Sequence, residues 1–273
     1  METPIVIDAC TLINLLRIDE DDDFLYKHLN SLHVHIAQTV YDEIKRNILR
    51  NKINEADEKR INKLLPSLSK VFTLHYDNDI KEDVGDEYFE QLCSFAGHTK
   101  KNNGELYSAI LALTLSRTEE SKVCFFTDDF PAKEEFREFF SIQQIGIIED
   151  SIDLLLMLHW SEKDFSMQKL KNVLKDLKAE YNRIQKSFVE EIKKIKPYKN
   201  SKIKKIIGNI EYSFFEGDMD KYKNNLSCLE GLNDKKIKDC LSEYPNMSKQ
   251  PEIAEKIDLT LKTLKELEIY KLV

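Results

Sequence analysis

The stretch TPIVIDACTLINLLR, residues 3–17, decides the fold class, because a buried strand and a helix meet in it at an acid. The apolar run 5–7 is typical of a strand in a sheet core, and it stops at Asp8. Apolar residues then recur at helical spacing from Leu12 onward. Asp8 either caps this helix or lies with other acids at the carboxyl edge of a parallel sheet, where open α/β sheets bind ligands. One acid leaves both interpretations open.

The first 160 residues alternate short apolar runs with helical patterns. This β-α-β rhythm predicts an α/β fold, in which helices cover both faces of a central parallel sheet in three α/β/α layers. Neither a P-loop nor a dinucleotide-binding fingerprint is present, which argues against nucleotide binding by those routes. The expected strands are residues 5–7, 34–37, 71–76, 123–127 and 145–148, and the expected helices lie near 11–17, 40–65, 83–96, 104–117, 132–140 and 151–160.

Composition indicates a folded chain without a membrane segment. The 273 residues are 41% hydrophobic and 33% charged, which is typical of globular proteins rather than disordered ones. No apolar run is long enough to span a membrane, and no signal peptide is recognisable. The five cysteines include no CxxC pair, which favours reduced thiols over a disulfide framework or a zinc site. We therefore expect a cytoplasmic protein that does not bind membranes.

Charge divides the chain into two parts. Residues 1–160 carry 17 basic and 30 acidic side chains, a net charge of −13, whereas residues 161–273 carry 24 and 19, a net charge of +5. The texture of the sequence changes at the same place, from alternating strands and helices to helices alone. We therefore expect an α/β domain over residues 1–160 and an all-helical domain over residues 161–273.

The helical half begins with a long amphipathic pattern. Apolar residues recur at steps of three and four over residues 165–196, until Pro197 stops them, which predicts one helix. Residues 161–208 carry a net charge of +8, which suits contacts with nucleic-acid phosphates. In the alternative interpretation these lysines are a solvated face, and the apolar stripe pairs two copies of the chain or holds a protein partner. The candidate nucleic-acid-binding residues are Lys193, Lys194, Lys204 and Lys205.

The C-terminal segment 251–273 looks like the core of a helix-turn-helix module. Its second helix would carry acids as well as lysines, which favours packing or protein contact over DNA binding. The pattern would place Ile253 and Ala254 in the first helix, Leu259 and Thr260 in the turn, and Thr263, Leu264 and Leu267 in the second helix.

Three further segments place acids where an expected element begins or ends. In AQTVYDEIKRN, residues 37–47, Thr39 and Asp42 suit a helix cap and leave Glu43 without a capping role in the first turn. In NNGELYSAILALTL, residues 102–115, Glu105 lies in the first turn of a helix. Singly, each acid is explained by the helix dipole or by a turn, whereas four in one repeated position point to a shared site. The last segment is KVCFFTDDF, residues 122–130, where a buried strand runs into Asp128 and Asp129.

This ordered set resembles the PIN-domain family of metal-dependent ribonucleases. The matching segments are VIDACTLINL, TVYDEI, GELYSAILALTL and FFTDDF, and together they cover roughly residues 4–150. The resemblance implies a PIN-like fold, here with an additional helical domain, that hydrolyses phosphodiester bonds of single-stranded or structured RNA. It assigns Mg²⁺ or Mn²⁺ to Asp8, Glu43, Glu105 and Asp129, with Asp128 as an assisting catalytic acid.

The chemistry of the residues fits that expectation. Mg²⁺ and Mn²⁺ prefer hard oxygen ligands, and clustered carboxylates repel one another until cations bind them. Thr11, Asn14 and Thr127 would orient the ligands or contact the substrate. The resemblance also implies a role as a toxin neutralised by an antitoxin, in RNA processing or in phage defence. The alternative is a non-catalytic PIN-like scaffold whose helical half binds a protein or nucleic acid partner.

Overall fold

The computed structural model describes residues 3–19, 23–49, 55–95, 104–195, 201–244, 247 and 250–269. The chain divides into two compact units, Met1–Val173 and Leu174–Val273. The expected α/β class is confirmed for the first unit, and the predicted boundary after residue 160 stays a prediction. Within the described ranges no helix combines the length and apolar character needed to cross a membrane.

A five-stranded parallel sheet forms the centre of the first unit. Its order is β3-β2-β1-β4-β5, so the chain reverses its direction of travel across the sheet between β1 and β4. These two strands are paired in register, with Ile7 opposite Phe126. The crevice outside the carboxyl ends at such a switch point is where open α/β sheets bind ligands. The strands are β1 (Ile5–Ile7), β2 (Val34–Ala37), β3 (Thr73–His75), β4 (Val123–Phe126) and β5 (Gly146–Glu149).

The strands form where the apolar runs predict them. The residues of β1 are all buried, as expected for a central strand covered on both faces. At the edge of the sheet, Gly146 opens β5, and a Cβ there would lie 1.9 Å from the carbonyl oxygen of Val123. Only glycine therefore lets β5 approach β4 this closely.

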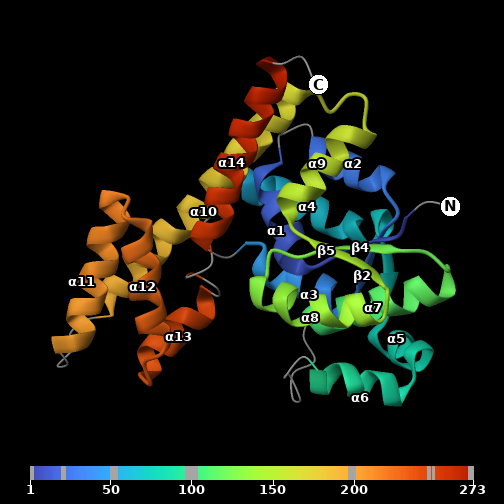
Figure 1. Cartoon of the computed structure of the whole chain (residues 1–273), viewed down its shortest axis with the longest axis horizontal. Helices are drawn as coiled ribbons and strands as arrows, with labels where there is room; N and C mark the ends of the chain where they lie inside the picture. The colour runs from blue at the N-terminus through green and yellow to red at the C-terminus, as the bar shows by residue number, and fades with distance from the viewer. Residues whose placement is uncertain are drawn as a thin grey trace. The chain divides into compact units, whose positions relative to one another are not determined.

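Nine described helices accompany this sheet. Figure 1 shows α1, α2 and α4 on one side of the strands and α7 and α8 on the other. Helix α7 contacts β1, β2 and β4, and 11 of its 15 residues are buried. The helices are α1 (Ala9–Ile18), α2 (Phe24–Ser31), α3 (Gln38–Asn47), α4 (Glu55–Val71), α5 (Asp77–Val84), α6 (Asp86–Phe95), α7 (Gly104–Thr118), α8 (Phe130–Ile142) and α9 (Ser151–Ser161).

The structure corrects several expected helices. The pattern at 40–65 is two helices, α3 and α4, and the residues between 49 and 55 lie outside the described ranges. The pattern at 83–96 begins inside α5 and continues as α6, because Gly85 adopts a φ of 81° and ends α5. Helix α2 was not expected, since its eight residues form too short a pattern to stand out.

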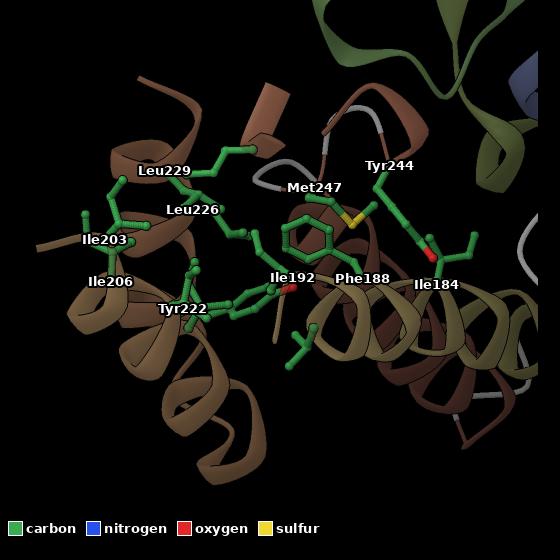
Figure 2. Packing of buried hydrophobic residues seen from close by; sticks show 14 residues of the cluster. Ile184, Phe188, Ile192, Ile203, Ile206, Tyr222, Leu226, Leu229, Tyr244 and Met247 are labelled. Atoms are coloured by element: carbon green, nitrogen blue, oxygen red, sulfur yellow. The ribbon is translucent and has the colours of Figure 1, made fainter. Parts of the chain in front are cut away.

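The second unit is helical, and α10 (Met167–Lys194) runs from the first unit into it. Its core gathers apolar side chains from α11, α12 and α13, and from Tyr244 and Met247, around the second half of α10 (Figure 2). Phe188 and Tyr222 are fully buried there. The remaining helices are α11 (Ser201–Glu216), α12 (Met219–Glu230), α13 (Lys235–Glu243) and α14 (Gln250–Ile269).

The expected helix-turn-helix tail is wrong. Residues 250–269 form one continuous helix, so no turn occurs at Leu259 and Thr260. No glycine or proline interrupts the segment there, and the hydroxyls of Thr260 and Thr263 donate hydrogen bonds to carbonyls of the same helix. Thr260 donates to the carbonyl of Lys256, and Thr263 donates to that of Leu259.

Candidate active site at the carboxyl edge of the sheet

Asp8 lies at the end of β1, with a side chain 1% exposed. It caps α1, because its Oδ1 accepts a hydrogen bond from the backbone N–H of Thr11 at 2.8 Å. Its Oδ2 accepts a bond from the Thr127 hydroxyl at 2.5 Å, which ties the ends of β1 and β4 together. Both interpretations of Asp8 therefore hold for its position: it is a helix cap, and it lies at the switch point of the sheet.

Burial raises the pKa of Asp8 well above its ordinary value. Hydrogen bonds from Thr127 and Thr11 oppose this shift, whereas the charges of Asp128 and Glu105 add to it. Neighbouring carboxylates thus act on Asp8 in the direction expected for clustered like charges.

The two acids after β4 have different surroundings. Asp128 is buried, and it accepts bonds at 2.9 Å from the side-chain amide of Asn14 and from the backbone N–H of Ser151. It therefore joins β4 to α1 and α9. Asp129 caps α8, accepting from Ala132 N–H at 3.1 Å, and is less buried than Asp128.

Glu105 and Glu43 approach from two other helices. Glu105 lies in the first turn of α7, and burial raises its pKa to about 7, with contributions from Asp129 and Glu43. Burial likewise raises the pKa of Glu43, and Asp129 contributes to that shift as well. Four elements that are distant in sequence therefore bring their acids within electrostatic range of one another.

Gly104 sets the distance between Glu43 and α7. Its N–H donates to Glu43 Oε1 at 3.4 Å, and a Cβ on Gly104 would lie 2.6 Å from Glu43 Oε2. Any larger residue would push the carboxylate away. The sequence signal for this role was the glycine directly before Glu105, in a chain with few glycines.

The predicted cap around Glu43 is wrong. Helix α3 begins at Gln38, one residue before Thr39, and no side chain caps it. The Thr39 hydroxyl donates to Asp77, and Asp42 accepts from the side chain of Gln38 at 3.0 Å. Glu43 consequently lies in the second turn of α3 rather than the first.

The four predicted ligands lie near one another, but their oxygens are not arranged as a complete metal-binding site. No three of the four predicted ligands, all of them described residues, bring oxygens within 4.8 Å of one another. In the described part of the chain only His28, Glu162 and Asp164 meet that condition. The His28 ring nitrogens lie 3.7 Å from Glu162 and 3.5 Å from Asp164. His28 also stacks against Phe165, which gives this second cluster a packing role.

Sequence reasoning missed two further groups at this edge. Lys133, in the first turn of α8, is buried with its ammonium 3.1 Å from Glu149 and 3.3 Å from Asp150. A cation in a first helical turn opposes the helix dipole, and that was the available signal. The second group is the Cys10 thiol, whose pKa is raised by burial and then by the surrounding acids, Asp8 first among them.

The predicted nucleic-acid-binding lysines lie in the second unit and fall into two pairs. Lys193 pairs with Glu211, and Lys194 pairs with Glu191 at 2.6 Å. Lys204 and Lys205 lie on α11, are exposed, and form no ion pair with any described residue. Only the second pair has its charge free of acidic partners within the described ranges.

Comparison with known proteins adds no relative. No protein-family model, no curated protein and no solved structure matches the chain. The function is therefore inferred from the geometry and chemistry of the acid cluster.

Proposed function

We propose that this chain is a metal-dependent endoribonuclease of the PIN type. The observation that carries the proposal is the convergence of acids from β1, α3, α7 and the end of β4. It is supported by the charges of Asp128, Asp129, Glu43 and Glu105, which raise the pKa values of neighbouring acids. The acids converge at the switch point between β1 and β4, the position where an α/β sheet offers a binding crevice.

The donor set suits a hard divalent cation. All four candidate ligands are carboxylates, and their mutual repulsion is relieved by positive charge. When bound, Mg²⁺ or Mn²⁺ would supply Lewis acidity and a more acidic water for attack on a phosphodiester. The residues that would hold it are Asp8, Glu43, Glu105 and Asp129.

The other residues of the edge fix these ligands. Thr11 and Thr127 hold the two oxygens of Asp8, so that its orientation is set before any substrate arrives. Asp128 has both oxygens engaged by Asn14 and Ser151, so its task is to join the elements of the site. Burial raises the pKa of Glu105 to about 7, and a bound cation would favour its ionised, metal-binding form.

The substrate is RNA, bound in part by the basic helical half, which offsets the negative charge of the first unit. The proposal includes a toxin, RNA-processing or phage-defence role in the cytoplasm, with an antitoxin, another protein or a second copy of the chain as partner. These roles all require the same intact acid cluster.

The decisive experiment is cleavage of labelled RNA with Mg²⁺, with Mn²⁺ and in excess EDTA. We expect cleavage that needs the ion, together with a rise in melting temperature when the ion is added, because an ion that binds only the folded acid cluster stabilises it. The variant Asp8→Asn/Glu43→Gln/Glu105→Gln/Asp129→Asn should lose both effects. Cleavage that persists in EDTA, or a thermal shift unchanged in this variant, would contradict the metal mechanism.

A second candidate function is a non-catalytic PIN-like scaffold. The observation in its favour is that Asp8, Asp128 and Asp129 all have structural hydrogen bonds that would persist without catalysis. This candidate predicts RNA or protein binding without cleavage and no thermal response to divalent cations. The assay above therefore separates the two functions.

A further inference from the structure

Helix α11 has two faces of opposite character. Its inner face supplies Ile203, Ile206, Ile207 and Ile210 to the core of the second unit, and Figure 2 shows the first two within that cluster. At 3.6 residues per turn, seven other residues fall within about a third of the helix circumference on the opposite side. We call this set the outer face of α11: Ser201, Lys204, Lys205, Gly208, Tyr212, Phe215 and Glu216.

Two aromatic rings stand on the outer face. Tyr212 is 64% exposed and Phe215 is 62% exposed, the latter among the most exposed large apolar side chains of the described residues. The ring of Phe215 packs edge-on against that of Phe214, with their centroids 5.5 Å apart. Phe214 in turn contacts the buried ring of Tyr222. The core of the unit therefore holds this exposed ring in place.

Glycine at the centre of the outer face has no explanation in the fold. A Cβ on Gly208 would meet nothing within 4 Å, so packing does not require a glycine there. Glycine in a helix interior is unfavourable relative to alanine. A glycine at this position leaves the helix backbone open to close approach by another chain.

Two lysines and one acid share the outer face with the two rings. Lys204 and Lys205 precede the rings by two to three turns of the helix and form no ion pair with any described residue, whereas the exposed Glu216 follows Phe215. Lys221 of α12 lies close enough for Tyr212 to contribute to the rise of its pKa, but it is paired with Asp218 at 2.6 Å. The acid Glu211 beside this face is paired with Lys193. The second unit as a whole carries 21 basic and 17 acidic residues, a net charge of +4.

We propose that the outer face of α11 binds single-stranded nucleic acid, with bases stacked on Tyr212 and Phe215 and phosphates held by Lys204 and Lys205. Exposed rings beside lysines match the two terms of single-strand binding, which are base stacking and neutralisation of phosphates. Paired bases in a duplex present no free faces to such rings. The identity of the strand as RNA rests on the proposed function, whereas the surface itself does not need catalysis.

The test measures binding of a short, non-self-complementary labelled RNA to the full-length chain in EDTA, at several salt concentrations. Tyr212→Ala/Phe215→Ala should weaken binding about 25-fold, at roughly 5-fold for each ring, with an unchanged salt dependence. Lys204→Gln/Lys205→Gln should also weaken binding, and should flatten the slope of log affinity against log salt by about 1.4.

Matched controls use exposed residues elsewhere. Tyr88→Ala removes an exposed ring of the first unit, and Lys235→Gln/Lys236→Gln removes two exposed lysines of α13. Both should leave affinity for the RNA within about threefold of the parent, because the proposal places the strand on α11. Circular dichroism melts of every variant exclude unfolding as the cause of a loss.

Each outcome decides for or against the proposal. Unchanged affinity in the ring variant overturns it, and so does an equal loss with duplex RNA, since stacking needs unpaired bases. A change of oligomeric state in the ring variant, seen by light scattering, with unchanged RNA affinity would instead make the outer face a protein contact. A single-stranded DNA arm distinguishes RNA from single strands in general. Binding that depends on α11 without any cleavage would leave this proposal standing while the nuclease proposal fails.

Discussion

The two units place their functional residues by different physical means. In the first unit the topology of a parallel sheet brings Asp8 and Asp129 from distant segments to one edge, and burial raises the pKa of Asp8. In the second unit a single helix buries one face and leaves Tyr212 exposed on the other. The charges follow the same division, with a net charge of −12 on residues 1–173 and +4 on residues 174–273.

The two kinds of site differ in their effect on the free energy of unfolding. Buried like charges oppose folding, because burial favours the neutral form of each acid and repulsion adds to the effect. An exposed lysine or ring on a helix costs the fold little, since solvent screens the charge and the opposite face supplies the packing. Removing an acid from the first unit should therefore affect activity and stability in opposite directions, whereas replacing the exposed lysines and rings of α11 should affect binding alone.

The largest expected effect is that of Asp8→Asn on cleavage. Activity should fall by at least about 100-fold, because even residues that only orient a ligand contribute 10- to 100-fold at metal sites. The fold should remain or gain stability, since the substitution removes a buried charge and the amide oxygen still accepts from Thr11 N–H. Cleavage rates measure the loss of activity, and thermal melts measure the change in stability.

Thr11→Val is the control for the Asp8 variant, because it removes the neighbouring hydroxyl without touching the carboxylate. We expect a much smaller loss of activity. Full activity in Asp8→Asn would remove that acid from the site, and a large loss of stability would make it a structural cap only.

The strands and the acid positions could be predicted because each has a local signal. Buried parallel strands are short apolar runs in the sequence. An acid directly after such a run, as Asp8 follows Ile7, can therefore be recognised from the sequence alone. Helix breaks were harder, since Gly85 ends α5 inside a pattern that otherwise continues.

Other features depend on packing that no local pattern records. Tyr212 and Phe215 have the helical spacing of core residues, and only the placement of Ile206 and Ile210 toward the core shows that the rings face outward. Lys133 likewise acquires its role from Glu149, which a separate strand brings beside it. The exposure of a ring and the pairing of a charge depend on tertiary structure, so they could not be predicted from the sequence alone.

The next effect concerns pH and the paired histidines of β2 and β3. His35 Nδ1 lies 2.9 Å from His75 Nε2, and burial together with the charges of His75 and His33 lowers the His35 pKa to about 4. Between pH 6.5 and 4 the unfolded chain therefore binds a proton that the folded chain excludes. The free energy of unfolding should fall by up to about 3 kcal/mol as pH drops through this window.

Urea unfolding at several pH values, compared between the parent and His35→Gln, isolates this contribution from that of the acids. The acids act with the opposite sign, because the raised pKa of Glu105 makes the fold more stable as pH falls below 7. The exposed His33, replaced by Gln, is the control and should change the profile far less. Identical profiles in His35→Gln and the parent would show that folding does not lower the pKa of His35.

A smaller effect is expected for Gly104→Ala in the first unit. The added methyl would lie 2.6 Å from Glu43 Oε2, so the carboxylate or the start of α7 must move. Overpacking of this kind costs about 1–3 kcal/mol. We expect lower stability, weaker stabilisation by Mg²⁺ or Mn²⁺ and slower cleavage, measured by melts with and without the ion. An unaltered response to the ion would show that the position of Glu43 is not critical.

The same substitution in the second unit, Gly208→Ala, should have the opposite effect on stability and is the smallest change expected. Nothing lies within 4 Å of the added methyl, and alanine is the better helix former, so unfolding should become harder by about 1 kcal/mol. Urea unfolding followed by circular dichroism measures this gain. If a strand approaches the helix at Gly208, affinity for single-stranded RNA should fall even as stability rises, a combination that damage to the fold does not produce. A gain in stability with unchanged RNA affinity would mean that the strand does not approach α11 at Gly208, and no gain in stability would show that the helix needs its glycine for a reason within the fold.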